Sequence, residues 1–359
     1  MRRENHTISI AIINLNGERW IKNLIDSIKN ALGYANLDDW EILLIDNGSS
    51  DKSPDIFMEQ FNRDDRVIAV KNKENLGWSP AVNQAFEMSC GNIIVVLSND
   101  MEIEKNSIES ILRIMEGNPK IGIVQFNSIR IHDRKTQDSG KNYTDRFGFL
   151  YGYKASKFPQ QVGMAEGMAF AVSRKLIKEG VKMDDSFFMM YDDADFSYRA
   201  RMMGYEVVFN PDSVVYHHRG GTVGKNARAI NPSLVKNGTR NHLTFILKCY
   251  ELKNVLMTFP IAFSISFIES FVLLRVDRRK FSANMSALIE VFLRISKTAK
   301  QRKEIQHNRK IPDRELFRLA HRFRPFSLIK NSAFTATNFS PKEIEGEIPD
   351  LIERDDPYV

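Results

Sequence analysis

The sequence is poor in cysteine and has no long apolar segment near its N-terminus. Its two cysteines, Cys90 and Cys249, form neither a metal-binding nor a redox spacing, so we expect reduced thiols. The start of the chain, MRRENHTISIAIINLNG, enters a strand-like run without the apolar region of a secretory signal. These absences predict a cytoplasmic protein.

Two common phosphate-binding motifs are also absent. No Gly-x-Gly-x-x-Gly fingerprint of a dinucleotide-binding fold follows any of the early apolar runs. The segment HHRGGTVGK superficially resembles a Walker A loop, but Arg219 stands where that motif needs Gly, and Asn226 stands where it needs Ser or Thr. We therefore expect no ATP hydrolysis by a P-loop mechanism.

Charge is distributed unevenly along a chain of otherwise ordinary globular composition, with 43% hydrophobic and 27% charged residues. The formal net charge is +6, yet the segment from Arg275 to Lys330 alone carries +11, which leaves −5 for the remainder. Nucleic acid and an anionic membrane surface are both candidate partners for this basic segment. A plain solvated helical face is the simpler alternative.

Short apolar runs alternate with helix-like stretches from Thr7 to about His218. Strand, helix, strand at this spacing is typical of an α/β protein whose mostly parallel sheet is covered by helices. The apolar runs are nearly continuous, which indicates burial on both faces of the sheet. We expect strands at 8–14, 41–46, 67–71, 92–98, 122–127, 168–173 and 205–217.

The chain changes character after His242, where an apolar stretch precedes the basic one. The uncharged run 254–268 is too short to cross a membrane, and extending it to Leu274 would place Pro260 and Glu269 inside the span. We favour helices that lie in the membrane interface with basic flanks. A true span and ordinary packing against the main domain remain open.

Polar residues follow several of the expected strands. Asp46 and Asn47 end a buried run, where a carboxylate can accept hydrogen bonds from a nucleobase or a ribose; a simple turn is the alternative. Asn14 ends the first strand and is a weaker case of the same kind. After Asn75, Gly77 precedes a helix and would let the backbone approach a ligand closely, although a helix cap explains it as well.

A single carboxylate, Asp100, ends the buried run that passes through Ser98 and Asn99. A turn would explain it, since Asn and Asp both suit chain reversals. Mg²⁺ and Mn²⁺ nevertheless need only one or two protein carboxylates when substrate phosphates and water complete the coordination. The motif is therefore also a candidate metal site.

Three acids, Asp192, Asp193 and Asp195, stand next to a helix that runs through Arg199. Asp195 can pair with Arg199 at the i, i+4 spacing, which gives it a structural role. The other two remain crowded beside an aromatic and methionine-rich run, a setting that raises carboxylate pKa values and suits a general base.

Two histidines, His217 and His218, close the last expected strand and enter a Gly-rich loop that contains Arg219 and Lys225. One of them could ligate a metal while the loop closes over a diphosphate. Each could equally be an ordinary surface or core residue.

In chain order these clusters resemble glycosyltransferase family 2, and within it the rhamnosyltransferase-like branch. The resemblance covers about Ser9 to Lys248; its segments are IDNGSSD, ENLGWSPAVNQA, LSND, EGVKMDDSFFMMYDDADFSYRARMMGY and HHRGGT. It implies a GT-A fold, which is an α/β, Rossmann-like architecture with a mixed, mostly parallel sheet. Added to the composition, it divides the chain into a GT-A domain at 1–248, a helical, apolar-then-basic extension at 249–330 and a polar tail at 331–359.

The resemblance also implies residue roles. Asp193 matches the second acid of the family's Glu-Asp pair, the catalytic base; the first acid is here the shorter Asp192, so the role could fall on Asp192 instead. Asp100 matches the last acid of the metal-binding Asp-x-Asp motif, and His217 or His218 is similar to the further ligand. The nucleotide-sugar-binding residues that we expect are Asn14, Asp46, Asn47, Asn75, Gly77, Asn99, Arg219 and Lys225.

The implied activity is an inverting transfer, dependent on Mg²⁺ or Mn²⁺, of a sugar from a dTDP- or UDP-linked donor to a hydroxyl of a glycan or a lipid-linked acceptor. We accordingly expect a role in polysaccharide biosynthesis, peripheral attachment to the cytoplasmic face of an anionic membrane and no nucleic-acid partner. A nucleotidyltransferase or another sugar-nucleotide enzyme is the alternative activity. A non-catalytic, membrane-associated scaffold with the same fold is the alternative of a different class.

Overall fold

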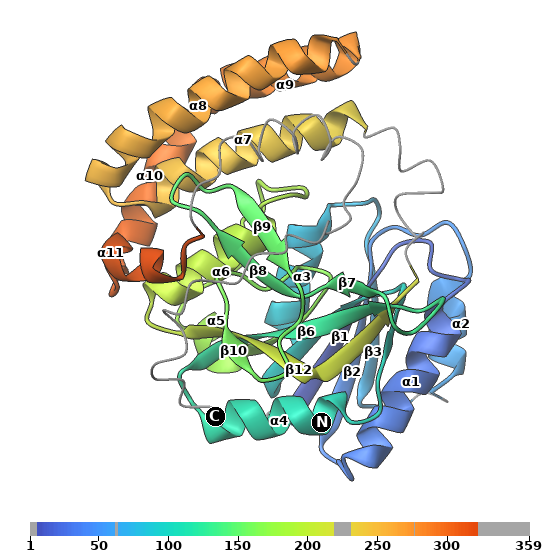
Figure 1. Ribbon diagram of the computed structural model, residues 1–359. Coiled ribbons are helices and arrows are strands. Elements are labelled where there is room, and N and C mark those ends of the chain that lie inside the picture. The colour runs from blue at the N-terminus through green and yellow to red at the C-terminus, as the bar shows by residue number, and fades with distance from the viewer. Residues whose placement is uncertain (1–5, 62–63, 219–230, 276, 322–359) are drawn as a thin grey trace.

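The computed structural model describes residues 6–61, 64–218, 231–275 and 277–321 (Figure 1). Two expected donor-binding residues, Arg219 and Lys225, lie outside these ranges, as does the expected polar tail. The remaining candidate residues are all described.

A ten-stranded mixed sheet forms the centre of the fold, with strand order β10-β12-β6-β11-β4-β1-β2-β3 and with β5 and β7 paired at its margin. The strands expected from sequence all form, most of them within a residue or two of the predicted ends. They are β1 (His6–Asn14), β2 (Trp40–Asp46), β3 (Val67–Lys71), β4 (Gly91–Ser98), β6 (Ile121–Arg130), β11 (Ala169–Ser173) and β12 (Glu206–His217).

Several short strands were not predicted, because they are too short to show a period in the sequence. They are β5 (Met101–Ile103), β7 (Gln137–Ser139) and β10 (Gln160–Gln161) in the main sheet, and β8 (Lys141–Thr144) and β9 (Leu150–Tyr153) in a separate pair. β5 pairs antiparallel with β12, and β7 pairs antiparallel with β6. Both short pairings shape the site described below.

Parallel pairing dominates the sheet, as expected: β1 is parallel to both β2 and β4, β2 to β3, and β6 to β12. Among the longer strands that the structure describes, β11 is the exception, because it runs antiparallel between β4 and β6. The carboxyl ends of β1, β2 and β4 therefore meet at one edge, which is where ligands bind in open α/β sheets.

Helices cover both faces of the sheet, which explains the nearly continuous apolar strands. On β1, Ile8, Ile10 and Ile12 face one core, while Ala11 and Ile13 face the other. The first core is closed by α1 (Ile21–Tyr34), α2 (Ser53–Glu59) and α4 (Ser107–Gly117). The second is closed by α3 (Trp78–Met88), α5 (Arg174–Lys178) and α6 (Asp192–Met202).

A layer of helices lies beyond α6 and forms the upper edge of the molecule in Figure 1. It consists of α7 (Pro232–Cys249), α8 (Leu252–Leu274), α9 (Arg278–Leu293), α10 (Ile295–His307), α11 (Asp313–Leu316) and a 3₁₀ turn at Phe317–Leu319. A third apolar cluster joins Tyr198 and Met202 of α6 to Leu243 and Phe245 of α7. The expected domain boundary falls at the end of α7, although α7 itself packs with α8 and α9 as part of this layer.

The apolar segment after His242 forms a longer helix than its uncharged run indicated. α8 continues through Pro260 and past Glu269, and its 23 residues have a mean hydropathy of 1.8 over the most apolar window. Among the described residues it is the one helix long and apolar enough to cross a membrane by length and composition. Only 28% of that window is buried within the structure.

Candidate functional site

The ends of β1, β2 and β4 bring three predicted residues together. Asn14 donates from Nδ2 to Oδ1 of Asp46 at 2.7 Å, and its Oδ1 accepts from Nδ2 of Asn99 at 2.8 Å. Asp46 is fully buried and also accepts from the backbone N–H of Ser49 at 3.2 Å. Here Asp46 therefore orders the loop that follows β2, and its oxygens already have partners.

A second group of predicted residues forms beside the first. Asn47 donates from Nδ2 to Oδ1 of Asn75 at 2.9 Å and to the carbonyl of Gly77 at 3.1 Å. Gly77 has a φ of 95°, a conformation that side chains disfavour, and a Cβ there would lie 2.7 Å from Cδ2 of Phe188. The close approach at Gly77 is thus made by the Phe188 ring, which links this loop to the segment before the acids.

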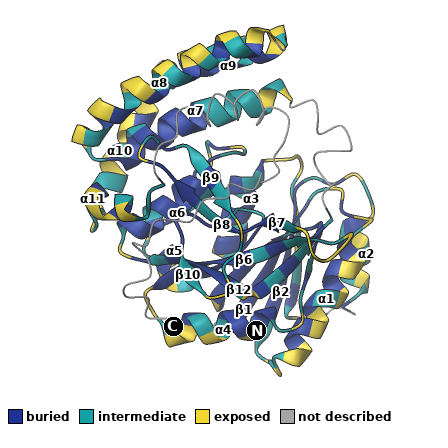
Figure 2. Cartoon of the chain, in the orientation of Figure 1, coloured by how far each residue is buried: buried dark blue, intermediate teal, exposed yellow. Residues whose placement is uncertain are grey.

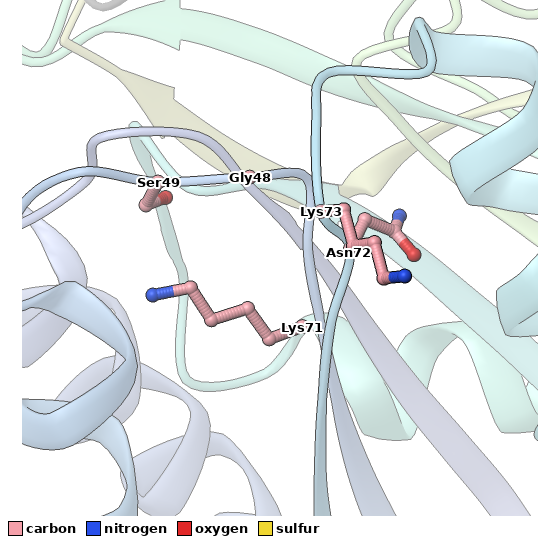
Figure 3. Close-up of a pocket in the computed structure, with 5 residues that line it drawn as sticks. All are labelled: Gly48, Ser49, Lys71, Asn72 and Lys73. Carbon is pink, nitrogen blue, oxygen red and sulfur yellow. The ribbon is translucent and has the colours of Figure 1, made fainter.

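A hollow opens at the carboxyl ends of β2 and β3 (Figure 3). Its lining comprises Gly48, Ser49, Lys71, Asn72 and Lys73. Figure 3 shows the Lys71 side chain extending on the Ser49 side of the hollow. Two lysines at the edge that carries the Asp46 loop give this region a positive potential, which suits an anionic ligand. Sequence analysis did not single out either lysine.

The two histidines contact different partners: His217 is the last residue of β12, and His218 follows the strand. His217 places Nε2 3.2 Å from Oδ2 of Asp100. His218 places Nε2 2.9 Å from Oε1 of Glu102 on β5. Of the two candidates, His217 is therefore the one that shares a site with Asp100.

Asp138 on β7 orients His217 and was missed by the sequence analysis. Its Oδ2 lies 2.6 Å from Nδ1 of His217, and the carboxylate is almost completely buried. Burial opposes the charged imidazole, but hydrogen bonds to Asp100 and Asp138 outweigh it and raise the pKa of His217 to about 9. The hydrogen bond with His217 likewise overcomes burial and lowers the pKa of Asp100.

Asp100 and His217 form a pair of candidate ligand groups rather than a closed cage. Across residues 6–61, 64–218, 231–275 and 277–321, no three His, Cys, Asp or Glu side chains are grouped to hold a metal ion. One carboxylate and one imidazole nevertheless fit a divalent cation that takes its other ligands from substrate phosphate and water. A carboxylate on the second ring nitrogen, as at Asp138, is the usual support of a metal-ligating histidine.

The predicted acids form the first turn of α6, and the structure distinguishes them. Asp192 is buried with 6% of its surface exposed, whereas Asp193 is only half-buried. Oδ2 of Asp193 accepts from the backbone N–H of Gly167 at 3.3 Å, and Oδ1 accepts from Ala194 at 2.7 Å. Burial raises the pKa of Asp193, and it raises that of Asp192 further with the help of the Asp193 charge. Asp193 is therefore the more accessible of the two carboxylates.

The backbone before these acids is held in an uncommon conformation. Met190 and Tyr191 have φ values of 71° and 64°, a region that non-glycine residues seldom occupy. The fully buried Asn241 of α7 donates to the carbonyls of Met189 and Met190 at 3.1 and 2.8 Å. The ring of His242 stacks on Tyr191 with centroids 5.0 Å apart. α7 thus holds the turn that presents Asp193.

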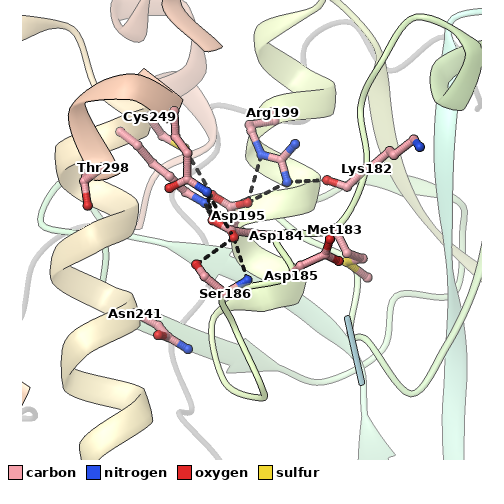
Figure 4. Close-up of polar contacts among 12 residues, drawn as sticks. Lys182, Met183, Asp184, Asp185, Ser186, Asp195, Arg199, Asn241, Cys249 and Thr298 are labelled. Atoms are coloured by element: carbon pink, nitrogen blue, oxygen red, sulfur yellow. Dashed lines mark hydrogen bonds and ion pairs between the residues drawn. The ribbon is translucent and has the colours of Figure 1, made fainter. Parts of the chain in front are cut away.

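A buried ion cluster also anchors α6 to α7 (Figure 4). Lys248 of α7 lies 2.9 Å from Oδ1 of Asp195 and also pairs with Asp184. Arg199 donates from Nε to Oδ2 of Asp195 at 2.8 Å, which confirms the predicted i, i+4 pair. Although burial disfavours each charge, the opposite charges keep Lys248 protonated, with a raised pKa, and Asp184 ionised, with a lowered one.

Glu166 lies near Asp138, His217 and Asp193, whose charges act on it, and no motif in the sequence marked it. Burial raises its pKa to about 7; a hydrogen bond with Ser139 opposes this, while the charges of Asp138 and Asp193 add to it. The next residue, Gly167, lies between Asp193 and the indole of Trp78: a Cβ on it would be 3.5 Å from Nε1. That indole N–H is buried and has no hydrogen-bond partner among the described residues.

Comparison with known proteins identifies relatives of this chain. Residues 9–181 match the model of glycosyl transferase family 2. The low-salt glycan biosynthesis hexosyltransferase Agl10 of Haloferax volcanii is 25% identical over 205 residues, covering 54% of this chain and 61% of that protein. An undecaprenyl-phosphate 4-deoxy-4-formamido-L-arabinose transferase of Pectobacterium carotovorum is 32% identical over 93 residues, covering 24% and 28%. The chain thus spans less than two thirds of the length of these curated relatives.

Solved structures share the fold. S. aureus TarS 1-349 in complex with UDP-GlcNAc superposes with a TM-score of 0.57 at 14% identity, covering 87% of this chain and 89% of that chain. GalNAc-T7 with UDP, GalNAc and Mn²⁺ gives a TM-score of 0.56 at 16% identity, covering 81% and 57%. These likenesses confirm the α/β GT-A fold expected from the sequence.

Proposed function

Since residues 9–181 form a glycosyl transferase family 2 domain, we propose that the chain is a glycosyltransferase that moves a sugar from a nucleoside-diphosphate sugar to an acceptor hydroxyl. One observation carries the proposal: Glu166 lies near enough to both His217, the partner of Asp100, and Asp193 for their charges to act on it, and the adjacent Gly167 donates to Asp193. A diphosphate site and a base for the acceptor would then be neighbours.

Asp193 acts as the general base. It takes the proton of the acceptor hydroxyl while that oxygen attacks the anomeric carbon, and the bond from that carbon to the diphosphate oxygen breaks. An in-line attack from the face opposite the leaving group inverts the anomeric centre. Burial and the charge of Asp193 raise the pKa of Asp192, which favours its protonated form beside the base. A positioned base of this kind contributes about 10²–10⁴-fold to the rate.

Asp100 and His217 would hold the divalent cation, Mg²⁺ or Mn²⁺. When bound, such an ion neutralises charge that develops on the leaving diphosphate. Asp138 keeps the His217 ring in the orientation that aims Nε2 at Asp100. The presence of Mn²⁺ beside UDP in the GalNAc-T7 structure supports a metal-dependent transfer.

The donor is a UDP- or dTDP-linked sugar that binds at the edge formed by β1, β2 and β3. UDP-GlcNAc in the TarS structure and UDP in the GalNAc-T7 structure support a pyrimidine nucleotide. Asn14, Asn47, Asn75 and Asn99 shape the loops of this edge. Lys71 adds positive charge beside it. The rhamnosyltransferase-like branch and the roles of Arg219 and Lys225 stay predictions.

The acceptor is a glycan or a lipid-linked glycan, and the protein works in polysaccharide biosynthesis at the cytoplasmic face of a membrane. The name of the Pectobacterium carotovorum relative includes undecaprenyl phosphate, and that of the Haloferax volcanii relative includes glycan biosynthesis. The apolar helix α8 gives independent support. The GT-A domain at 1–248 would then perform the transfer while the extension at 249–330 attaches it to the membrane.

A panel of sugar nucleotides with Mn²⁺ or Mg²⁺ tests this function. A donor should raise the melting temperature of the protein, because a ligand that binds only the folded state stabilises it. Turnover with that donor should release a nucleoside diphosphate, and Asp193→Asn should bind the donor without turnover. Release of pyrophosphate would indicate a nucleotidyltransferase instead. Binding with no turnover on any acceptor, glycan or lipid-linked, would favour the non-catalytic scaffold.

A further inference from the structure

α8 exposes most of its large apolar side chains, whereas Ala262, Ser266 and Ser270 are buried together with Val255 and Leu273. Eight of its large apolar residues are 41% to 70% exposed along one side of the helix (Figure 2). They are Leu252, Leu256, Met257, Ile261, Phe267, Ile268, Phe271 and Leu274. A helix at a water-facing surface normally does the reverse, with its apolar stripe towards the core.

The buried side of α8 is lined by small and hydroxyl-bearing residues. Ala262, Ser266 and Ser270 recur at every fourth position and are at most 3% exposed. Asn284 of α9 donates from Nδ2 to the carbonyl of Ser266 at 2.8 Å and to Oγ of Ser270 at 2.9 Å. Small residues at the contact and polar side chains that join neighbouring helices are typical of helices that pack in lipid.

The exposed stripe continues onto the end of α9 and the start of α10. Phe292 and Leu293 are 53% and 79% exposed, and Ile295 is 45% exposed. Phe292 also packs against Phe263 of α8 with ring centroids 5.5 Å apart, so the two helices share one surface. We call the exposed apolar residues of α8 and α9, together with Ile295, the outer face.

Basic residues lie at both ends of the outer face. Arg275, Arg278 and Arg279 are exposed at the turn between α8 and α9. Lys253 at the start of α8, and Lys297 and Lys300 on α10, are exposed at the other end. The charge that sequence analysis found in the C-terminal part of the chain therefore flanks an apolar surface. Apolar area between basic residues is the pattern of a helix that lies in an anionic membrane interface.

We propose that the outer face docks onto an anionic lipid surface, with α8 parallel to the membrane plane and its apolar residues at the boundary of headgroups and acyl chains. This goes beyond the proposed function by naming the surface and its lipid chemistry, and it does not depend on transfer activity. α8 does not cross the bilayer in this arrangement, because its inner side packs on α7 and α9. α7 carries the buried charges Arg240 and Lys248, which lipid would not solvate.

The charge pattern also distinguishes lipid from a second copy of the chain. Both ends of the outer face are basic, so two copies stacked on each other would bring cations together in either orientation. Anionic headgroups instead complement both ends at once. Each Lys or Arg near such a surface contributes about 1 kcal/mol.

Co-sedimentation of the full chain with vesicles tests the docking surface. The protein should sediment with phosphatidylcholine vesicles that contain phosphatidylglycerol, and much less with phosphatidylcholine alone. The double variant Ile268→Glu/Phe271→Glu should bind about tenfold more weakly or worse, because it places two charges in the apolar stripe. Arg278→Ser/Arg279→Ser should lose about tenfold on the anionic vesicles only. All four substituted side chains are exposed: Ile268 by 61%, Phe271 by 50%, and the charged Arg278 and Arg279 as well. Both double variants should therefore still fold.

The matched control is Tyr34→Glu/Phe158→Glu, two apolar residues that are 52% and 58% exposed outside the outer face. Vesicle binding of this variant should equal that of the unmodified chain. Failure of the unmodified chain to sediment with either vesicle, or an equal loss in the control, would overturn the proposal. So would a lipid-free dimer that the outer-face variant dissociates. A donor-induced rise in melting temperature should persist in every variant, which keeps a failed membrane test separate from a failed transferase assignment.

Discussion

Nδ1 of His217 lies 2.6 Å from Oδ2 of Asp138, and Nε2 of the same ring lies 3.2 Å from Oδ2 of Asp100. The ring is thus held from one side and presented to a carboxylate on the other. His218, the next residue, contacts Glu102 instead. The different partners of His217 and His218 lead to the first two predictions.

Removing the support of His217 should weaken metal use. In Asp138→Asn, the ring loses its charged partner, and the Mn²⁺ concentration for half-maximal activity should rise about 10–100-fold. Titration of activity with Mn²⁺ at saturating donor measures this. The maximal rate at high Mn²⁺ should largely recover, and an unchanged titration curve would rule out an orienting role for Asp138.

The two adjacent histidines should behave differently. His217→Ala removes a ligand atom next to Asp100 and should raise the Mn²⁺ requirement at least about tenfold. His218→Ala breaks only the contact with Glu102 and serves as the matched control, with little change in the Mn²⁺ requirement. Calorimetric titration of Mn²⁺ in the presence of a nucleoside diphosphate compares them. The reverse ranking would transfer the ligand role to His218.

Substitutions of the two adjacent acids, Asp192 and Asp193, should also differ in their effect on kcat. Asp193→Asn should lower kcat about 10²–10⁴-fold, because the acceptor proton loses its base, while donor affinity is kept. Asp192→Asn should cost less, since a buried, protonated carboxyl group resembles an amide in shape and charge. Steady-state kinetics on both variants, with calorimetry of donor binding, measures the difference. A larger loss in Asp192→Asn would move the base to that residue.

The rate should depend on pH through Asp193. A base must be ionised, and burial raises the pKa of Asp193 above its ordinary value near 3.9. As pH falls through the raised pKa, Asp193 takes up a proton and kcat should fall about tenfold per pH unit. A pH profile of kcat at saturating donor and metal checks this, with donor binding measured at the same pH values. A rate that stays level down to the ordinary aspartate pKa would contradict the assignment.

The buried ion cluster of Lys248, Asp184 and Asp195, which joins α7 to α6, should contribute to stability. Lys248→Met leaves Asp184 and Asp195 buried with less compensation and should cost about 3–5 kcal/mol of unfolding free energy. Lys182→Met is the control, because its ion pair with Glu87, at 2.8 Å, is exposed and such pairs contribute about 0–1 kcal/mol. Denaturant titration at neutral pH compares both with the unmodified chain. Equal stability of the two variants would show that Lys248 is dispensable.

The same cluster predicts an acid sensitivity. The charge of Lys248 overcomes burial and lowers the pKa of Asp184, so this carboxylate stabilises the fold above its unfolded pKa. That contribution is lost as pH falls towards the lowered pKa of the folded state. Lys248→Met should therefore show a flatter decline of stability in acid than the unmodified chain.

Much of the fold follows from local sequence pattern. Nearly continuous apolar strands require helices on both faces, and β1, with Ile8, Ile10 and Ile12 facing one core and Ala11 and Ile13 the other, shows why. Polar residues at the ends of such strands converge because parallel strands end at one edge. Asn14, Asp46 and Asn99 were therefore predictable as a group.

The tertiary structure alone decided which of these groups complete a site. His217 ends β12 and His218 follows it, but only the pairing of β12 with β5 and of β6 with β7 shows which of them meets Asp100 and Asp138. The left-handed turn at Met190 depends on Asn241, which is fifty residues away in the chain and has no local signature.

The C-terminal helices likewise show what the sequence determines and what only tertiary packing decides. Composition determined that 252–274 is apolar and that basic residues follow it. Which side of α8 is buried could not be read from its pattern, because packing on α9 favoured the small side chains that permit close approach and left the large apolar ones outside. Local spacing sets which residues share a face, whereas contacts distant in sequence decide what that face meets.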